Sequence, residues 1–177
     1  MSAFQAGVIA SCLAVAAMGG AAAAQEGTPA AAKPAASDLQ YFVGQWRVAA
    51  RDPRTGKTEA MTYRVEPVLS GTWFAGAGAS EQPGFQARDM WGRDPSTGGV
   101  IRMAFDGGGS FASLSSPGRK GDTLVLEGEA RHEGGTTRVH QTITRVGPDE
   151  FRAVWEALRG GVWTAYSDEK VTRRPVA

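Results

Sequence analysis

Turn-forming residues recur about every 8 to 12 residues through most of this chain, and this spacing constrains the fold more than any other feature. Glycine supplies positive φ angles and proline fixes its own φ angle, so both suit tight turns. Of the 177 residues, 24 are glycine, and this punctuation accounts for most of them. The turns fall at 52–56, 70–71, 82–84, 94–98, 106–109, 117–121, 133–135, 147–149 and 160–161. They separate ten short strand candidates.

These strand candidates predict an all-β fold. Helical periodicity over ten or more residues is missing, and a brief helical pattern occurs only at Ser37–Val43, before Gly44. Ten antiparallel strands in meander order predict a closed up-and-down β-barrel with a short N-terminal helical turn, because closure removes exposed sheet edges. An open β-sandwich is the structural alternative.

Two hairpins predict their own strand registers. Around Glu133-Gly134, pairing residues whose numbers sum to 267 sets Glu129 opposite Arg138 on one face and Leu124 opposite Ile143 on the other. One face is then charge-complementary and the other apolar, as a sheet with one wet side requires. Around 147–149, a sum of 296 pairs Gln141 with Trp155, and together the two registers place His140 between Glu127 and Glu156 on the outer face.

Alternation along the strands predicts which side chains enter the barrel. The expected inward set is mostly apolar: Trp46, Met61, Tyr63, Val65, Met103, Phe105, Leu124, Leu126, Val139, Gln141, Ile143, Phe151 and Trp155. In the fifth strand this assignment sends Ile101, Met103 and Phe105 inward and Arg102 outward. The facing of the last strand, 162–173, stays open.

The chain begins with an uncharged leader. Residues 1–24 combine an apolar run with small residues before Gln25, which predicts a signal peptide cleaved near Ala24 and a periplasmic or secreted protein. A membrane anchor is the alternative, but the run is short and rich in Ala and Gly. Cys12 fits a relaxed lipidation pattern, although we interpret it as part of the apolar run. Residues 25–36 are expected to form a disordered Ala/Pro tether, and 37–175 the barrel domain.

Charge and motif content exclude several function classes. The 19 Lys and Arg residues nearly balance the 18 Asp and Glu residues, for a net charge of +1, which argues against nucleic-acid binding. A single Cys excludes an intramolecular disulfide. Nucleophile-elbow, phosphate-loop and zinc-protease motifs are missing, so we expect no catalytic residues, no metal site and no cofactor. His140 with its two carboxylates is interpreted as a cross-strand charge row, not a metal site.

Short motifs suggest a family. The segment Gly44-Gln45-Trp46, after a short helix and before a ten-strand meander, resembles the calycin superfamily of lipocalins, fatty-acid-binding proteins and nitrobindins. Together with 68–71, 91–98 and 121–129, it more closely resembles a bacterial family of secreted or cytosolic proteins of unknown function, over about 39–173. The resemblance implies that Trp46 closes one barrel end beneath Arg173 or Arg174. Haem binding is not carried over from nitrobindins, since His140 is expected to face outward.

The predicted interior suits a small hydrophobic or amphipathic ligand. The candidate ligand-binding residues are Met61, Tyr63, Met103, Phe105, Gln141 and Trp155, and the candidate barrel-closing residues are Trp46 and Arg173. A barrel filled by side chains is equally compatible with this sequence and would favour a protein–protein interaction or structural module of the cell envelope. An enzyme is a remote alternative. No membrane span is expected after cleavage, and the sequence does not predict an oligomeric state.

Overall fold

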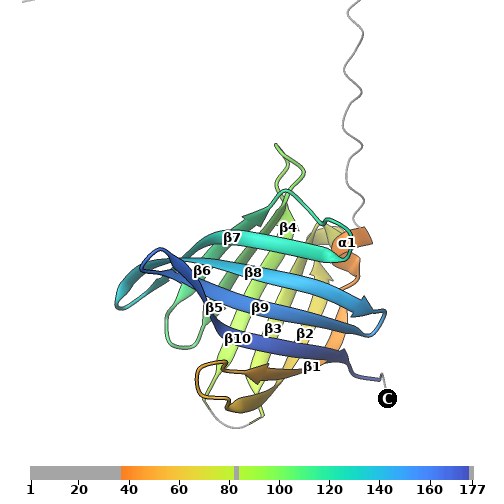
Figure 1. Ribbon diagram of the computed structural model, residues 1–177. Coiled ribbons are helices and arrows are strands. Elements are labelled where there is room, and N and C mark those ends of the chain that lie inside the picture. The colour runs from red at the N-terminus through yellow and green to blue at the C-terminus, as the bar shows by residue number, and fades with distance from the viewer. Residues whose placement is uncertain (1–36, 82–83, 176–177) are drawn as a thin grey trace, which may run out of the picture. The chain divides into compact units, whose positions relative to one another are not determined.

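The computed structural model describes residues 37–81 and 84–175, and in this part the strands form one closed antiparallel barrel (Figure 1). The predicted signal peptide and tether, residues 1–36, lie outside the described residues. The elements, in chain order, are α1 (Ser37–Gln40), β1 (Gly44–Arg51), β2 (Thr58–Val68), the 3-10 turn η1 (Leu69–Gly71), β3 (Trp73–Ser80), β4 (Gln86–Arg93), β5 (Val100–Asp106), β6 (Phe111–Ser116), β7 (Thr123–His132), β8 (Gly135–Gly147), β9 (Glu150–Arg159) and β10 (Val162–Arg173).

Each strand pairs with its neighbours in the chain, and β1 pairs with β10 to close the barrel. The all-β, ten-strand, up-and-down prediction with one short helical turn is therefore confirmed, and the sandwich alternative is excluded. Both predicted registers are also confirmed: Glu129 lies opposite Arg138 and Gln141 lies opposite Trp155. Because charge-complementary and apolar faces lie on opposite sides of a strand, a slip by one residue would have buried the charges.

Two strands depart from simple alternation. In β5, Val100 and Arg102 are buried whereas Met103 is 38% exposed, so the facing predicted for Ile101 and Met103 is wrong. In β10, the pairing with β9 shifts between Ala165 and Ser167. This β-bulge breaks the two-residue period, which explains why alternation left the facing of that strand open.

One end of the barrel is sealed by the N-terminal segment. Figure 1 shows α1 at the end of the barrel where β10 finishes. Phe42, 4% exposed, stacks on Trp91 at a centroid separation of 5.3 Å and meets Phe151 edge-on at 5.4 Å. The Trp46 indole is fully buried and donates a hydrogen bond to the Phe42 carbonyl at 2.7 Å. These aromatic contacts form an apolar floor.

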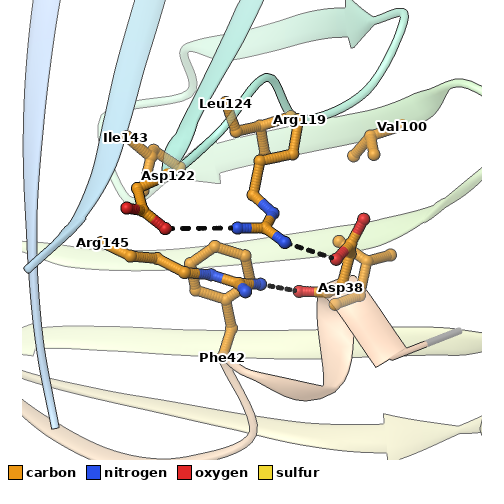
Figure 2. Close-up of a pocket in the computed structure, with 9 residues that line it drawn as sticks. Asp38, Phe42, Val100, Arg119, Asp122, Leu124, Ile143 and Arg145 are labelled. Carbon is orange, nitrogen blue, oxygen red and sulfur yellow. Dashed lines mark hydrogen bonds and ion pairs between the residues drawn. The ribbon is translucent and has the colours of Figure 1, made fainter. Parts of the chain in front are cut away.

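Charged side chains attach this helical segment to the barrel wall (Figure 2). Arg145 of β8 donates to the Asp38 carbonyl at 2.6 Å, and its guanidinium lies 4.1 Å from the Tyr41 ring centroid. Arg119 lies 3.4 Å from the Asp38 carboxylate and 3.5 Å from that of Asp122. The segment is thus held by hydrogen bonds and ion pairs as well as by Phe42. Within 37–81 and 84–175, no helix is long and apolar enough to cross a membrane.

Candidate binding site in the barrel

The barrel encloses a cavity of about 550 Å³. Its sealed end is formed by Phe42, Trp91 and Phe151, and its lining continues to Glu59, Phe85 and Ser110 near the turns at the opposite end. Apolar side chains from several strands cover most of the wall, including Val48, Ala50, Met61, Ala104, Ile143 and Val171. A hollow of this size with apolar walls is typical of small-molecule sites.

A buried ion pair lies in the wall of the cavity. Arg102 of β5 donates from Nη2 to the Asp89 carboxylate of β4 at 2.5 Å and from Nε at 3.1 Å. Both side chains are nearly inaccessible, at 11% and 4% exposure. Burial lowers the pKa of Arg102, but Asp89, Tyr63 and Glu169 together outweigh that effect and hold the pKa above its ordinary value. Arg102 therefore remains protonated inside the barrel.

Aromatic and polar neighbours complete the environment of this pair. The Arg102 guanidinium lies 4.3 Å from the Trp91 ring centroid and 5.1 Å from that of Trp155, so both rings contribute cation–π contacts. Arg102 also donates to the side-chain carbonyl of Gln141. Tyr63 donates its hydroxyl hydrogen to Asp89, at 2.9 Å from Oδ2. Buried charges persist where, as here, hydrogen bonds satisfy them.

The two tyrosines of the cavity keep their protons at neutral pH. Burial raises the pKa of Tyr63 well above its ordinary value, and the nearby Asp89 carboxylate adds to this effect. Burial and the Glu169 carboxylate raise the pKa of Tyr166 to about 12. Tyr63 accepts a hydrogen bond from the Trp91 indole at 3.0 Å. Both phenols are thus neutral groups in the cavity wall.

The carboxyl group of Glu169 on β10 also lines the cavity. Ser167 donates to its Oε1 at 3.2 Å. Burial raises the pKa of Glu169, and the positive charge of Arg102 only partly offsets this. The bulge in β10 explains why both Tyr166 and Ser167 line the cavity although they are adjacent in sequence.

Of the six predicted ligand-binding residues, five line the cavity: Met61, Tyr63, Phe105, Gln141 and Trp155. Met103 instead lies on the outer face of β5. Phe105 is exposed and stacks with Phe111, at a centroid separation of 6.2 Å, close to the open end. At the closed end, the Arg173 guanidinium lies 4.1 Å from the Trp46 ring centroid.

Sequence reasoning missed the charged groups of the cavity. Alternation places Arg102 outside, the expected inward set does not include Asp89, and Glu169 falls on the strand whose facing stays open. The available signal was the Gly at position 76 opposite Asp89. A glycine in a strand interior often marks a site where another group approaches closely.

His140 lies outside the cavity, as its register predicted. It pairs with Glu127 on β7 and Glu156 on β9, and its Nε2 forms a hydrogen bond with the Glu156 carboxylate. The Trp163 ring packs on it at a centroid distance of 4.1 Å. In the described part of the chain, no group of three or more His, Cys, Asp or Glu side chains could hold a metal ion.

Comparison with known proteins adds little to this geometry. No family model and no curated protein matches the chain. Among solved structures, the chain is similar to a redesigned β-barrel at 13% identity, over 77% of this chain and 94% of that one, with a TM-score of 0.36. The function must therefore be argued from the cavity itself.

Proposed function

We propose that this protein is an exported β-barrel, with a calycin-like role, that binds one small hydrophobic or amphipathic molecule in its interior. The observation that carries the proposal is the cavity of about 550 Å³, closed at one end by Phe42 and Trp91. Ligand pockets commonly measure about 300 to 1,000 Å³ and combine apolar walls with a few polar groups. A barrel filled by its own side chains would leave no such space.

Protein purified from its own periplasm tests this proposal. Native mass spectrometry should detect a bound small molecule that organic extraction removes, and the extracted protein should bind a neutral fluorescent probe such as N-phenyl-1-naphthylamine. Protein that is consistently empty and does not respond to the probe would exclude the binding function.

Two neighbouring alanines of β1 provide matched variants. Ala50 lines the cavity, whereas Ala49 is exposed on the outer face. Ala50→Phe should weaken probe binding by about tenfold or more, because the new ring occupies the space that the probe needs. Ala49→Phe should retain the affinity of the unmodified protein. Equal losses in both variants would indicate a general disturbance of the barrel instead of a site within it.

The export part of the proposal has its own test. Residues 1–24 carry the pattern of a signal peptide. N-terminal sequencing of protein from the periplasmic fraction should begin at Gln25. Protein found only in the cytoplasm would contradict export, and a retained leader would contradict cleavage; either result leaves the binding function to be judged separately.

An envelope interaction module remains the second candidate. Met103 presents apolar surface on the outer face of β5 at 38% exposure, which is compatible with contact to another protein. Crosslinking in intact cells should then recover one specific partner, and Met103→Ser should abolish its recovery. Recovery of no specific partner would exclude this role.

A further inference from the structure

The carboxyl groups that line the cavity, those of Glu59, Asp89, Asp106 and Glu169, outnumber its two cationic side chains, Arg88 and Arg102. Arg102 and Asp89 neutralise each other through two hydrogen bonds. Glu169 receives a hydrogen bond from Ser167, but within 37–81 and 84–175 no Lys, Arg or His nitrogen lies within ion-pair distance of it. Glu169 is thus a carboxyl group of the cavity wall without a cationic partner.

Arg102 is poorly placed to bind an anion. Three of its five N–H groups are committed, two to Asp89 and one to Gln141. Its guanidinium also contacts the rings of Trp91 and Trp155. An anionic ligand would have to compete with Asp89 for Arg102 and would also be repelled by Glu169. The charges of the cavity therefore favour a cation.

The surroundings of Glu169 suit an organic cation better than a hydrated metal ion. The Trp155 and Tyr166 rings lie 6.3 Å apart, centroid to centroid, and both residues line the same cavity as Glu169. Aromatic faces attract organic ammonium groups, and they offer no ligands of the kind that metal ions prefer. Most of the remaining wall is apolar, including Val48, Met61 and Ala104.

We propose that the ligand is an amphipathic amine whose ammonium group pairs with the Glu169 carboxylate while its apolar part occupies the rest of the cavity. This inference rests on the proposed binding function and specifies the chemistry of its ligand. The ammonium group forms a charge-assisted hydrogen bond in a low-dielectric site, and such bonds are stronger than neutral ones.

The proposal implies that binding depends on pH. Burial raises the pKa of Glu169, so this group becomes protonated and neutral at a higher pH than an exposed glutamate does. An ammonium ligand binds the ionised form, so its affinity should fall as the pH is lowered through the pKa of Glu169. The groups that face Glu169 are Arg102 from β5, Trp155 from β9, and Tyr166, Ser167 and Asp168 from β10 itself. On the other side, Glu169 lies opposite Ala50 of β1, and Ala50 in turn lies opposite Glu59 of β2, which is the next ionisable group in that direction.

Three ligands of equal chain length separate the effects of charge and apolar contact. Octylamine, 1-octanol and octanoate would each displace N-phenyl-1-naphthylamine from the full protein at pH 8. The affinity of octylamine should exceed that of 1-octanol by about tenfold or more, and octanoate should have the lowest affinity of the three. In Glu169→Gln the advantage of octylamine over 1-octanol should vanish. Glu66→Gln, on the exposed face of β2 beside Arg64, should retain that advantage.

The outcomes distinguish this inference from the binding function on which it rests. If the probe binds but octylamine and 1-octanol have equal affinities, the ammonium proposal is wrong and the binding function stands. Preferential binding of octanoate would overturn it in favour of Arg102 as the partner of an anion. If the probe does not bind, both fail. A pH series on the unmodified protein needs no variant: an octylamine advantage that does not decline between pH 8 and pH 4, below the ordinary glutamate pKa of 4.5, contradicts the role of Glu169.

Discussion

At the scale of single residues, the most informative side chain is Arg102. Hydrophobic alternation placed it outside because Ile101, Met103 and Phe105 are more apolar than their neighbours. The barrel reverses this facing because three other strands supply compensation: Asp89 from β4, Gln141 from β8 and Trp155 from β9. These partners are far apart in sequence, so no local pattern predicts that a buried arginine will be satisfied.

Removing one member of this pair should be costly. Asp89→Asn keeps the side-chain shape but leaves Arg102 buried without its counter-charge, and such changes destabilise by about 3 to 5 kcal/mol. Urea denaturation followed by tryptophan fluorescence measures this difference. The double variant Asp89→Leu/Arg102→Met should recover most of the loss, since apolar residues often replace a buried pair at little cost. A double variant as unstable as the single one would contradict this interpretation.

Glu169 should destabilise the empty protein at neutral pH. The folded state raises the pKa of this carboxyl above its ordinary value of 4.5. Between those two pKa values the folded chain holds a proton that the unfolded chain has lost, so stability decreases as the pH rises through this window. Glu169→Gln removes that decrease. The variant should therefore gain stability relative to the unmodified protein as the pH rises from 4 to 7.

Thermal unfolding at several pH values checks this expectation, with Glu66→Gln as the exposed control. Parallel curves for Glu169→Gln and the unmodified protein would show that the carboxyl titrates normally. A site that is unfavourable while empty and is relieved by its ligand is a common cost of function.

At the scale of strands, β3 is shaped by the charges it must accommodate. A Cβ atom at Gly76 would lie 1.7 Å from Asp89 Oδ1 and 2.6 Å from the Tyr63 hydroxyl. At Gly78, two residues along the same strand, the nearest atom would be 3.7 Å away, an ordinary contact. The small residue is thus required at Gly76 and merely tolerated at Gly78.

These two glycines make a matched prediction. Gly76→Ala forces Asp89 away from Arg102 and should destabilise the barrel by about 3 kcal/mol or more, as breaking the buried pair does. Gly78→Ala should be neutral or stabilise by up to about 1 kcal/mol, because alanine loses less backbone entropy on folding. Chemical denaturation of the two variants checks the contrast. Equal effects would mean that the close approach at Gly76 does not govern stability.

The strands also show which parts of the fold were predictable. Turn spacing fixed the number of strands, and the charge rows Glu129–Arg138 and His140–Glu156 fixed two registers, because each row is local to one hairpin. The inward-facing side chains of β5 and the bulge in β10 were not predictable, since both depend on contacts between strands that are distant in sequence. The apolar part of the site therefore followed from alternation, whereas its charged part did not.

At the scale of the whole molecule, the barrel has two unlike ends. The closed end holds the aromatic floor together with the first and last of the described residues, and the open end leads into the cavity. Because β1 pairs with β10, closure of the sheet depends on contacts between residues more than 100 positions apart. Such non-local pairings are gained late and lost together, so side chains that join the first and last strands matter to the entire barrel.

Arg173, on the last strand β10, contacts the first strand β1 and the segment that precedes it. It donates to the Val43 carbonyl at 2.7 Å and to the Tyr41 carbonyl at 3.0 Å, reaches the Asp149 carboxylate at 2.9 Å, and packs on the ring of Trp46. A hydrogen bond to a charged group contributes about 1.5 to 3 kcal/mol. Arg173→Ala should therefore cost about 3 kcal/mol or more in unfolding free energy.

The neighbouring Arg174 provides the control, because its side chain is exposed and only its backbone N–H bonds to the Gln45 carbonyl, at 2.8 Å. Arg174→Ala should leave stability within about 0.5 kcal/mol of the unmodified protein. Arg173→Lys keeps the charge but loses the planar fork that serves three acceptors, so its stability should fall between the two. In amide hydrogen exchange, Arg173→Ala should release β1 and β10 together. Release of β10 alone would show that Arg173 anchors one strand and does not close the barrel.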